Sequence, residues 1–221
     1  KDQTYFLYQL KQEQLGHILF PLADLEKEQV RTIARKNKLV VANKKDSMGI
    51  CFVGDISVGK WLKEKFGEKK GEVRLADGTI IGEHDGYYLF TIGSRGGWRR
   101  TQKIKNERIK NDALPKLYVT KIIPDQNIIV VGEREGAMSS EFYLTDVHWI
   151  NPSYRIEDTI YHMRIRNTGD LIPARLIPKE NKLKVMLGKP EFGVSAGQSG
   201  VIYVQTKEIS ICLGGGIIAR S

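Results

Sequence analysis

The sequence predicts an α+β protein of several domains, helical in its first third and rich in β-strands after that. Between residues 3 and 66, apolar residues recur at helical spacing behind residues that can cap a helix. From Gly71 the apolar period changes to two, and glycine, aspartate and asparagine separate the short runs. A chain of 221 residues allows one large domain or two to three small ones. We expect domains at residues 1–66, 67–139 and 140–221.

Three helices are expected in the first domain. The first spans Gln3 to Glu13, the second follows an N-cap at Asp24, and the third follows an N-cap at Ser57. The end turns of the second helix carry charges that complement the helix dipole, acidic first and basic last. These charged residues are Glu26, Glu28, Arg35, Lys36 and Lys38. The apolar residues expected to face inward are Leu25, Val30, Ile33, Ala34, Trp61, Leu62 and Phe66.

Strands and tight turns fill the predicted central domain. Its expected strands are Val73–Leu75, Thr79–Ile81, Tyr87–Ile92, Leu117–Ile123 and Asn127–Val131. Gly78 lies between the first two strands and tolerates the positive φ of a tight turn, which predicts a hairpin. Pro124 opens the turn between the last two strands. The polar residues Glu133–Ser140 are expected to form a linker.

The last domain is predicted to be a small closed β-barrel. Turn residues at Asn167–Asp170 and Glu180–Asn181 separate short strands at regular intervals, as in antiparallel barrels. The expected strands are Tyr143–Trp149, Thr159–Arg166, Leu171–Ile177, Lys182–Leu187, Gly200–Gln205 and Glu208–Leu213. Gly214–Gly216 lacks the Lys-Ser or Lys-Thr pair and the helix of a phosphate-binding loop, so we expect a β-bulge or a barrel-closing turn there.

The balance of charge favours a polyanionic partner. There are 35 Lys and Arg against 26 Asp and Glu, a net charge of +9. Residues 94–111 form a glycine-interrupted basic loop that contains Arg95, Arg99, Arg100, Lys103, Lys105, Arg108 and Lys110. Such a loop can neutralise backbone phosphates, and Trp98 within it could stack on an RNA base. A solvated surface loop is the alternative interpretation.

Composition excludes several classes of protein. Hydrophobic residues make up 41% and charged residues 28%, which is typical of globular rather than disordered proteins. Two cysteines make no disulfide framework, which favours the reducing cytoplasm. No apolar run is long enough to span a membrane, and no secretory signal peptide is present. The four histidines show no metal-ligand spacing, and we expect His84 to be a surface residue.

Cys51 is the residue best suited to covalent chemistry. Glycines flank its segment, and the nearby Lys44 and Lys45 favour the thiolate, the form that acts as a nucleophile or carries sulfur. A small buried apolar residue is the competing interpretation. Cys212 lies in an alternating run that predicts a core strand, so a structural role is expected there.

Five motifs occur in one order along the chain: Lys1–Leu7, Lys45–Gly54, Gly82–Gly86, Thr91–Gly93 and Cys212–Ile218. Together they resemble the tRNA-specific 2-thiouridylase family from the first residue to nearly the last. The resemblance implies an α/β pyrophosphatase-loop catalytic domain, a central β-rich domain and a C-terminal β-barrel. It further implies that residues 1–66 are the helical tail of that catalytic domain.

The resemblance implies a reaction in two stages. ATP and Mg²⁺ adenylate C2 of the wobble uridine, residue 34 of the tRNA, and a cysteine persulfide then replaces the adenylate with sulfur. Cys51 matches the cysteine that carries the persulfide. The ATP-binding loop and a first cysteine are expected to precede Lys1, so these 221 residues alone are expected to be inactive. A stand-alone tRNA-binding or RNA-binding module without catalysis is the alternative.

The resemblance also assigns residues and partners for tRNA. The residues at tRNA-contacting positions are Lys1, Asp2, Gln3, Arg164, Ile165 and Gln198. Ile165 stands where the family usually has tyrosine, so it cannot stack or donate a hydrogen bond, and Ser94 stands where glutamine is usual. The implied partners are the tRNAs for Lys, Glu and Gln and a sulfur-relay protein or cysteine desulfurase. No metal ion is expected to bind these residues.

Overall fold

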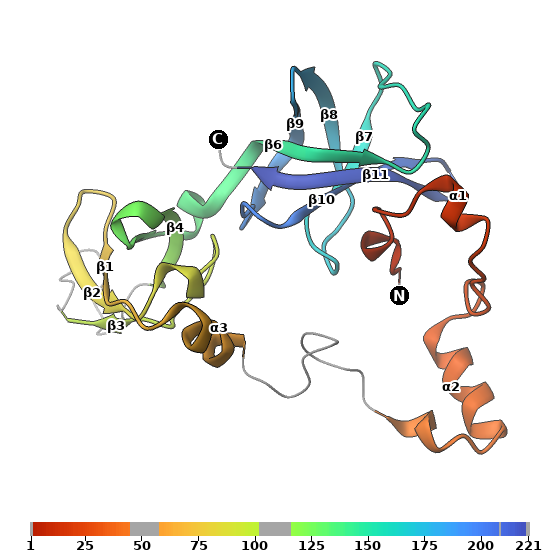
Figure 1. Ribbon diagram of the computed structural model, residues 1–221, viewed down its shortest axis with the longest axis horizontal. Coiled ribbons are helices and arrows are strands. Elements are labelled where there is room, and N and C mark those ends of the chain that lie inside the picture. The colour runs from red at the N-terminus through yellow and green to blue at the C-terminus, as the bar shows by residue number, and fades with distance from the viewer. Residues whose placement is uncertain (1, 45–57, 102–115, 208, 220–221) are drawn as a thin grey trace.

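The structure is a computed structural model that describes residues 2–44, 58–101, 116–207 and 209–219 (Figure 1). It contains a closed β-barrel, a five-stranded sheet and a helical N-terminal segment that runs beside the barrel and then away from it. The expected α+β class with an antiparallel C-terminal barrel is confirmed. Predictions that lie outside the described residues concern Lys1, Cys51, Ser57 and most of the basic loop 94–111.

Six antiparallel strands close the barrel in the order β10-β11-β6-β9-β8-β7, with β7 paired to β10. Their bounds are β6 Met138–Trp149, β7 Tyr161–Arg164, β8 Ile172–Lys179, β9 Lys182–Phe192, β10 Ser199–Gln205 and β11 Ser210–Ala219. Alternation along each strand fills the interior: Leu183 and Val185 are buried, whereas Lys182 and Met186 face outward. All six expected strands are present, and β6, β9 and β11 extend beyond their expected ends.

The glycine run in β11 allows the barrel to close tightly. β11 continues through Gly214–Gly216, and its pairing with β6 changes register there, as the expected bulge requires. Gly214 has φ +147°, and a Cβ at this position would lie 2.1 Å from the carbonyl oxygen of His148. Only glycine can occupy this close backbone approach without a shift of the neighbouring strand.

The central sheet has the strand order β3-β2-β1-β5-β4, and only the β1–β5 pair is parallel. The bounds are β1 Gly71–Arg74, β2 Ile80–His84, β3 Arg99–Arg100, β4 Tyr118–Ile123 and β5 Ile128–Gly132. Both expected hairpins form: Gly78 has φ +89°, and Asn127 ends the Pro124–Gln126 3₁₀ turn with φ +54°. The expected linker is a 3₁₀ turn, Arg134–Ala137, that leads directly into β6.

The expected strand at Tyr87–Ile92 is wrong. A 3₁₀ turn covers Tyr87–Leu89 instead, because the side chain of Asn127 accepts a hydrogen bond from the Tyr87 N–H (3.2 Å). The apolar side chains of this turn pack against the buried face of the sheet, where Val73, Ile129 and Val131 lie. The sequence pattern therefore indicated burial correctly but not the backbone conformation.

Phe192 at the end of β9 joins the barrel to the central sheet. Its ring meets Tyr118 edge to face with the centroids 5.4 Å apart, and the Arg134 guanidinium lies 4.4 Å from its centroid. The hydroxyl of Ser195 donates a 3.4 Å hydrogen bond to the Ile92 carbonyl. The barrel and the central sheet therefore contact each other through these residues.

The N-terminal segment differs most from expectation. The helix expected at Gln3–Glu13 is wrong, since only a 3₁₀ turn at Thr4–Phe6 and the short α1 at Gln12–Leu15 form. Between them, the Tyr8 hydroxyl and the Leu10 carbonyl contact the barrel, at Ser199 and His148, while the Leu10 N–H donates to the Leu7 carbonyl. The remaining helices are α2 Lys27–Lys36, a 3₁₀ turn Val40–Asn43 and α3 Val58–Phe66.

Helix α2 has the expected charges but another cap and no core. Glu26, not Asp24, is the N-cap, and its N–H donates to the Gln29 side chain (2.7 Å). No residue of α2 is buried, and Ile33 is 47% exposed. Trp61 and Phe66 of α3 are also about half exposed, so the expectation that apolar residues face inward is wrong for Ile33, Trp61 and Phe66. The other four expected residues, Leu25, Val30, Ala34 and Leu62, are partly buried.

Candidate nucleic-acid interface

Residues 2–12, named here the N-terminal strap, lie against the barrel beside its last two strands (Figure 1). The Tyr5 hydroxyl donates to the Ser199 carbonyl (2.9 Å), and the Tyr8 hydroxyl lies 3.1 Å from the Ser199 Oγ. At the other end of the strap, the Gln12 N–H donates to the Ile150 carbonyl (2.9 Å). The strap is therefore held at both ends of its length.

Apolar contact supports these hydrogen bonds. Tyr8 is 5% exposed and packs with Val201 and Tyr203 of β10, both fully buried. Tyr5 and Leu171 pack at the edge of the same cluster. Because aromatic side chains bury large areas, this cluster supplies more of the strap's binding energy than its neutral hydrogen bonds do.

An ion pair fixes the start of the strap. Arg164 Nη1 of β7 donates to the Asp2 carboxylate (2.6 Å), which also accepts from the Thr4 N–H (2.8 Å) and the Thr4 hydroxyl (2.6 Å). The Thr4 Oγ1 lies 3.1 Å from the Tyr203 hydroxyl, and the Arg164 guanidinium lies 5.3 Å from the Tyr203 ring centroid. We name these four residues, Asp2, Thr4, Arg164 and Tyr203, the clamp.

The clamp keeps fixed protonation states near neutral pH. Burial by itself would raise the pKa of Asp2, but the hydrogen bonds from Thr4 and Arg164 outweigh it and hold the pKa below 3.8. Burial raises the pKa of Tyr203 to about 12. Asp2 is therefore an anion and Tyr203 a neutral phenol, and the ion pair persists across the physiological range.

The remaining tRNA-assigned residues have different environments. Ile165, the residue directly after β7, is 2% exposed and belongs to the barrel core, so its side chain offers nothing to RNA. Gln3 is exposed on the strap. Gln198 accepts the Ile218 N–H on its carbonyl (2.8 Å), while its side-chain Oε1 is buried without a hydrogen-bond partner among the described residues.

Cys212 lies in β11 next to the strap cluster. It is partly buried, and burial raises the pKa of its thiol to about 11. A thiol with such a pKa is protonated at neutral pH and is a poor nucleophile, which agrees with the structural role expected for it. Cys51 lies outside the described residues, so its environment stays a sequence-based prediction.

The described part of the basic loop is tied to the central sheet. Arg99 donates to Asp85 (2.7 Å), which also accepts from Lys63 of α3 (2.7 Å). Trp98 packs against the sheet core and the Arg100 guanidinium lies 5.2 Å from its centroid, so the protein covers part of the ring that was expected to stack on a base. Hydrogen bonds from Arg99 and Lys63 lower the pKa of Asp85 to about 2.

His84 is buried rather than a surface residue, and that expectation is wrong. Its ring is 1% exposed and meets Phe90 edge to face at 5.3 Å. Its Nδ1 accepts the Gly86 N–H (3.0 Å), and burial lowers the pKa. The imidazole is therefore neutral, and its hydrogen bond stabilises the turn that follows β2.

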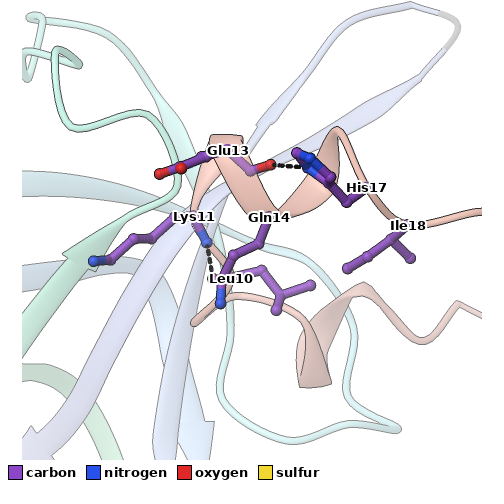
Figure 2. Close-up of a pocket in the computed structure, with 6 residues that line it drawn as sticks. All are labelled: Leu10, Lys11, Glu13, Gln14, His17 and Ile18. Carbon is purple, nitrogen blue, oxygen red and sulfur yellow. Dashed lines mark hydrogen bonds between the residues drawn. The ribbon is translucent and has the colours of Figure 1, made fainter.

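Two open hollows of about 450 Å³ have linings that include none of the four clamp residues. Figure 2 shows the first, whose lining comes entirely from residues 10–18; Lys11 donates from its N–H to the Gln14 side chain, and the His17 ring lies against the Glu13 carbonyl. The second lies between α3 and the glycines after Ser94, with Lys63 and Arg95 in its lining. Neither gathers a set of groups suited to catalysis.

The described residues contain no cluster of metal-binding side chains. Among them, no three His, Cys, Asp or Glu residues come together as ligands for a metal ion. The sequence also carries no phosphate-binding loop. No described helix is long and apolar enough to cross a membrane.

Sequence reasoning missed the residues that seat the strap on the barrel: Tyr5, Tyr8, Ser199 and Tyr203. From the sequence alone, the spacing of Tyr5 and Tyr8 predicts only that both lie on one face of a helix. The signal in the sequence was the three-residue spacing of two tyrosines, whose hydroxyls need partners when buried. The position of those partners, almost 200 residues later, has no local signature.

Comparison with known families covers almost the whole chain. Residues 1–55 match the family described as "tRNA methyl transferase HUP domain", residues 59–133 the "tRNA methyl transferase PRC-barrel domain", and residues 139–218 the "Aminomethyltransferase beta-barrel domain". The third range covers the six-stranded barrel and the second covers the five-stranded sheet.

Curated relatives carry one name. The chain is 36% identical over 222 residues to the tRNA-specific 2-thiouridylase MnmA of Synechococcus sp. (strain JA-3-3Ab), covering 100% of this chain and 56% of that protein. It is 35% identical to the protein of the same name from Shewanella sp. (strain MR-7) and 38% identical to tRNA-specific 2-thiouridylase MnmA 1 of Clostridium tetani, covering 99% of this chain and 57% of each relative. The chain thus spans slightly more than half the length of these relatives. With the three family matches in order and an alignment that covers the whole of this chain, the chain belongs to the tRNA-specific 2-thiouridylase family.

Proposed function

We propose that this chain is the tRNA-holding and sulfur-carrying part of a tRNA-uridine 2-sulfurtransferase. The whole reaction is the ATP-dependent and Mg²⁺-dependent adenylation of C2 of uridine 34, followed by replacement of the adenylate with sulfur from a cysteine persulfide. The barrel and strap hold the tRNA, and Cys51 carries the sulfur. The proposed substrates are cytoplasmic tRNAs for Lys, Glu and Gln, and a cysteine desulfurase or relay protein supplies the sulfur.

One observation carries this proposal: the chain aligns over its whole length with named tRNA-specific 2-thiouridylases, in three domains of matching order. The geometry supports it further. Asp2 and Arg164, which are 162 positions apart, meet at 2.6 Å, and Gln198 adjoins the Ser199 that binds the strap. The net charge of +9 favours association with a polyanion.

The same proposal limits what these residues do alone. Because the described residues contain no cluster of metal-binding side chains and the sequence carries no phosphate-binding loop, we expect the purified chain to bind tRNA without releasing AMP or pyrophosphate from ATP. Release of AMP that depends on both tRNA and this chain would contradict the expectation that these residues alone are inactive. Binding should weaken steeply with salt because Lys and Arg displace condensed cations from the phosphates.

The experiment compares three chains: the wild type, Cys51→Ser and the matched control Cys212→Ser. Each is incubated with a cysteine desulfurase and ³⁵S-cysteine and then assayed for protein-bound sulfur that a reductant releases. Wild type and Cys212→Ser should take up the label and Cys51→Ser should not. Equal uptake by all three would refute Cys51 as carrier, and tRNA binding without any uptake would favour an RNA-binding module without catalysis.

A further inference from the structure

Tyr203 of β10 is a buried residue that contacts both ends of the ion pair at the start of the strap. Its side chain is 0% exposed, and the Arg164 guanidinium lies 5.3 Å from its ring centroid. Its hydroxyl lies 3.1 Å from the Thr4 Oγ1, and Thr4 in turn contacts the Asp2 carboxylate. Tyr203 is thus linked to one tRNA-assigned residue directly and to the other through Thr4.

The direction of these hydrogen bonds follows from the protons that are available. An ionised carboxylate only accepts, so the Thr4 hydroxyl donates its single proton to Asp2 (2.6 Å). The Thr4 Oγ1 can then only accept from Tyr203, whose phenol is protonated at neutral pH. The Tyr203 hydroxyl therefore donates to Thr4, Thr4 donates to Asp2, and Arg164 donates to the same carboxylate (2.6 Å).

Arg164 depends on the same residues for its orientation. The guanidinium lies over the Tyr203 ring, and its Nη1 is bound to Asp2. Among the described residues Asp2 is the single hydrogen-bond partner of this side chain, so the Nη2 protons are left for a phosphate oxygen. Because the Arg164 side chain is only 12% exposed, its orientation decides whether it reaches the RNA.

Building on the proposed function, we propose that Tyr203 is a positioning residue for tRNA binding: its buried hydroxyl and ring hold Asp2 and Arg164 in the arrangement in which these two residues meet the RNA. Tyr203 itself does not touch tRNA, because its side chain is fully buried. Loss of the hydroxyl removes the donor to Thr4 and loosens Asp2. Loss of the ring also removes the surface on which the Arg164 guanidinium rests.

Two changes at this position separate the hydroxyl from the ring. Tyr203→Phe keeps the ring under Arg164 and removes one neutral hydrogen bond, so tRNA should bind about threefold to tenfold more weakly. Tyr203→Leu removes both contacts and should weaken binding further. Neither change alters a charge, so the slope of log affinity against log salt should stay that of wild type, whereas Arg164→Gln should reduce it by about one.

Thr4→Val tests the same contacts from the strap, outside the barrel core, and stays informative if Tyr203→Phe folds poorly. We expect it to bind tRNA at least as weakly as Tyr203→Phe, because Asp2 then loses the Thr4 hydroxyl. In a chain that already carries Thr4→Val, Tyr203→Phe should cause no further loss, since the bond that it removes no longer exists. Additive losses would show that Tyr203 does not act through Thr4 and would contradict the proposal.

Tyr161→Phe is the matched control for a merely structural role. Tyr161 of β7 is also fully buried in the barrel, and its hydroxyl lies 3.1 Å from the Tyr154 hydroxyl and accepts from the Glu157 N–H (2.9 Å). Its loss should lower the melting temperature about as much as Tyr203→Phe does and leave tRNA affinity unchanged. Equal losses of affinity in the two variants would reduce Tyr203 to a residue of the barrel core.

The experiment measures tRNA affinity of the full 221-residue chain at several salt concentrations, and hydrogen exchange of the Thr4 N–H without RNA. This amide donates to Asp2, so its exchange should be about threefold or more faster in Tyr203→Phe and unchanged in Tyr161→Phe. If wild type fails to bind tRNA, the proposed function fails. If wild type binds and Tyr203→Phe binds equally well, the positioning role of Tyr203 is refuted while the proposed function stands.

Discussion

The barrel and helix α2 contain similar apolar patterns but reach opposite outcomes. In the barrel, alternate residues such as Val185 and Ile202 are fully buried against one another. In α2, Val30, Ile33 and Ala34 lie on one face, yet none is buried, and the helix packs chiefly against the 3₁₀ turn Val40–Asn43. The exposed apolar side chains continue on both sides of α2, at Leu19, Phe20, Leu39 and Val40.

This difference shows that apolar periodicity in a sequence predicts which face of a helix or strand is apolar. It does not predict which other element, if any, packs on that face. A strand in a closed barrel receives its partners from its neighbours in the same sheet. A single helix needs a second element, and within the described residues no large element covers α2. Its conformation depends on the Glu26–Gln29 cap and on helix propensity, which are each worth about 1 kcal/mol or less.

The largest expected contrast is between two truncations of isoleucine. Ile202→Ala in β10 opens a cavity in a fully buried site and should lower the free energy of unfolding by about 2–5 kcal/mol. Ile33→Ala in α2 removes a half-exposed side chain and should change it by less than about 0.5 kcal/mol. Urea denaturation measures both. Similar losses for the two variants would contradict the contrast between the regions.

A second contrast compares glycines with positive φ in the barrel and in the sheet. Gly214→Ala should cost about 2–4 kcal/mol, because it adds a clash with the His148 carbonyl to the backbone strain. Gly78→Ala meets nothing within 4 Å and should cost only the strain of its turn, about 1–2 kcal/mol. Thermal melting of the two variants ranks them. If Gly78→Ala is less stable than Gly214→Ala, the barrel tolerates the displacement of the His148 carbonyl and the expected order is wrong.

The strap should fall between the barrel and α2. Tyr8→Phe removes the hydroxyl that pairs with Ser199 and should cost about 1 kcal/mol, with faster hydrogen exchange in residues 2–12. Tyr143→Phe on the partly exposed outer side of β6 is the control and should have a smaller effect. If Tyr8→Phe leaves exchange in the strap unchanged, apolar packing alone holds this segment.

The smallest effect concerns pH and the central sheet. The pKa of Asp85 is about 2 when folded against 3.8 as its ordinary value, so the unfolded state binds more protons between these values. The stabilisation by Asp85 is therefore complete above about pH 4 and is lost as the pH falls towards 2. The stability difference between wild type and Asp85→Asn should shrink over this range, whereas parallel curves would contradict the role of Lys63 and Arg99.

The sequence predicted the barrel well because its information is local. Each strand carries its own alternation, and turn residues such as Asn167–Asp170 mark the ends, so all six strands were found without knowledge of their order. The two hairpins of the sheet were found for the same reason, from Gly78 and Pro124. Pairing of β1 with β5, which is parallel, has no local signal.

The failures in the strap and in the central sheet depend on contacts between distant segments. Residues 3–13 have helical spacing, but their tyrosines bind Ser199, which competes successfully with a helix. His84 and Trp98 are rings with a polar edge in a charged segment, and only the assembled sheet buries His84 and partly buries Trp98. The ion pair between Asp2 and Arg164 likewise emerges only when β7 meets the strap.

The most direct test of the account is hydrogen exchange of the full chain with and without tRNA at about 50 mM salt, where phosphate contacts are strong. The account predicts protection in residues 2–12 and around Gln198 in the barrel, and none in α2. Protection that is confined to α2, or no protection while tRNA is demonstrably bound, would contradict the assignment of the strap and barrel as the RNA-binding surface.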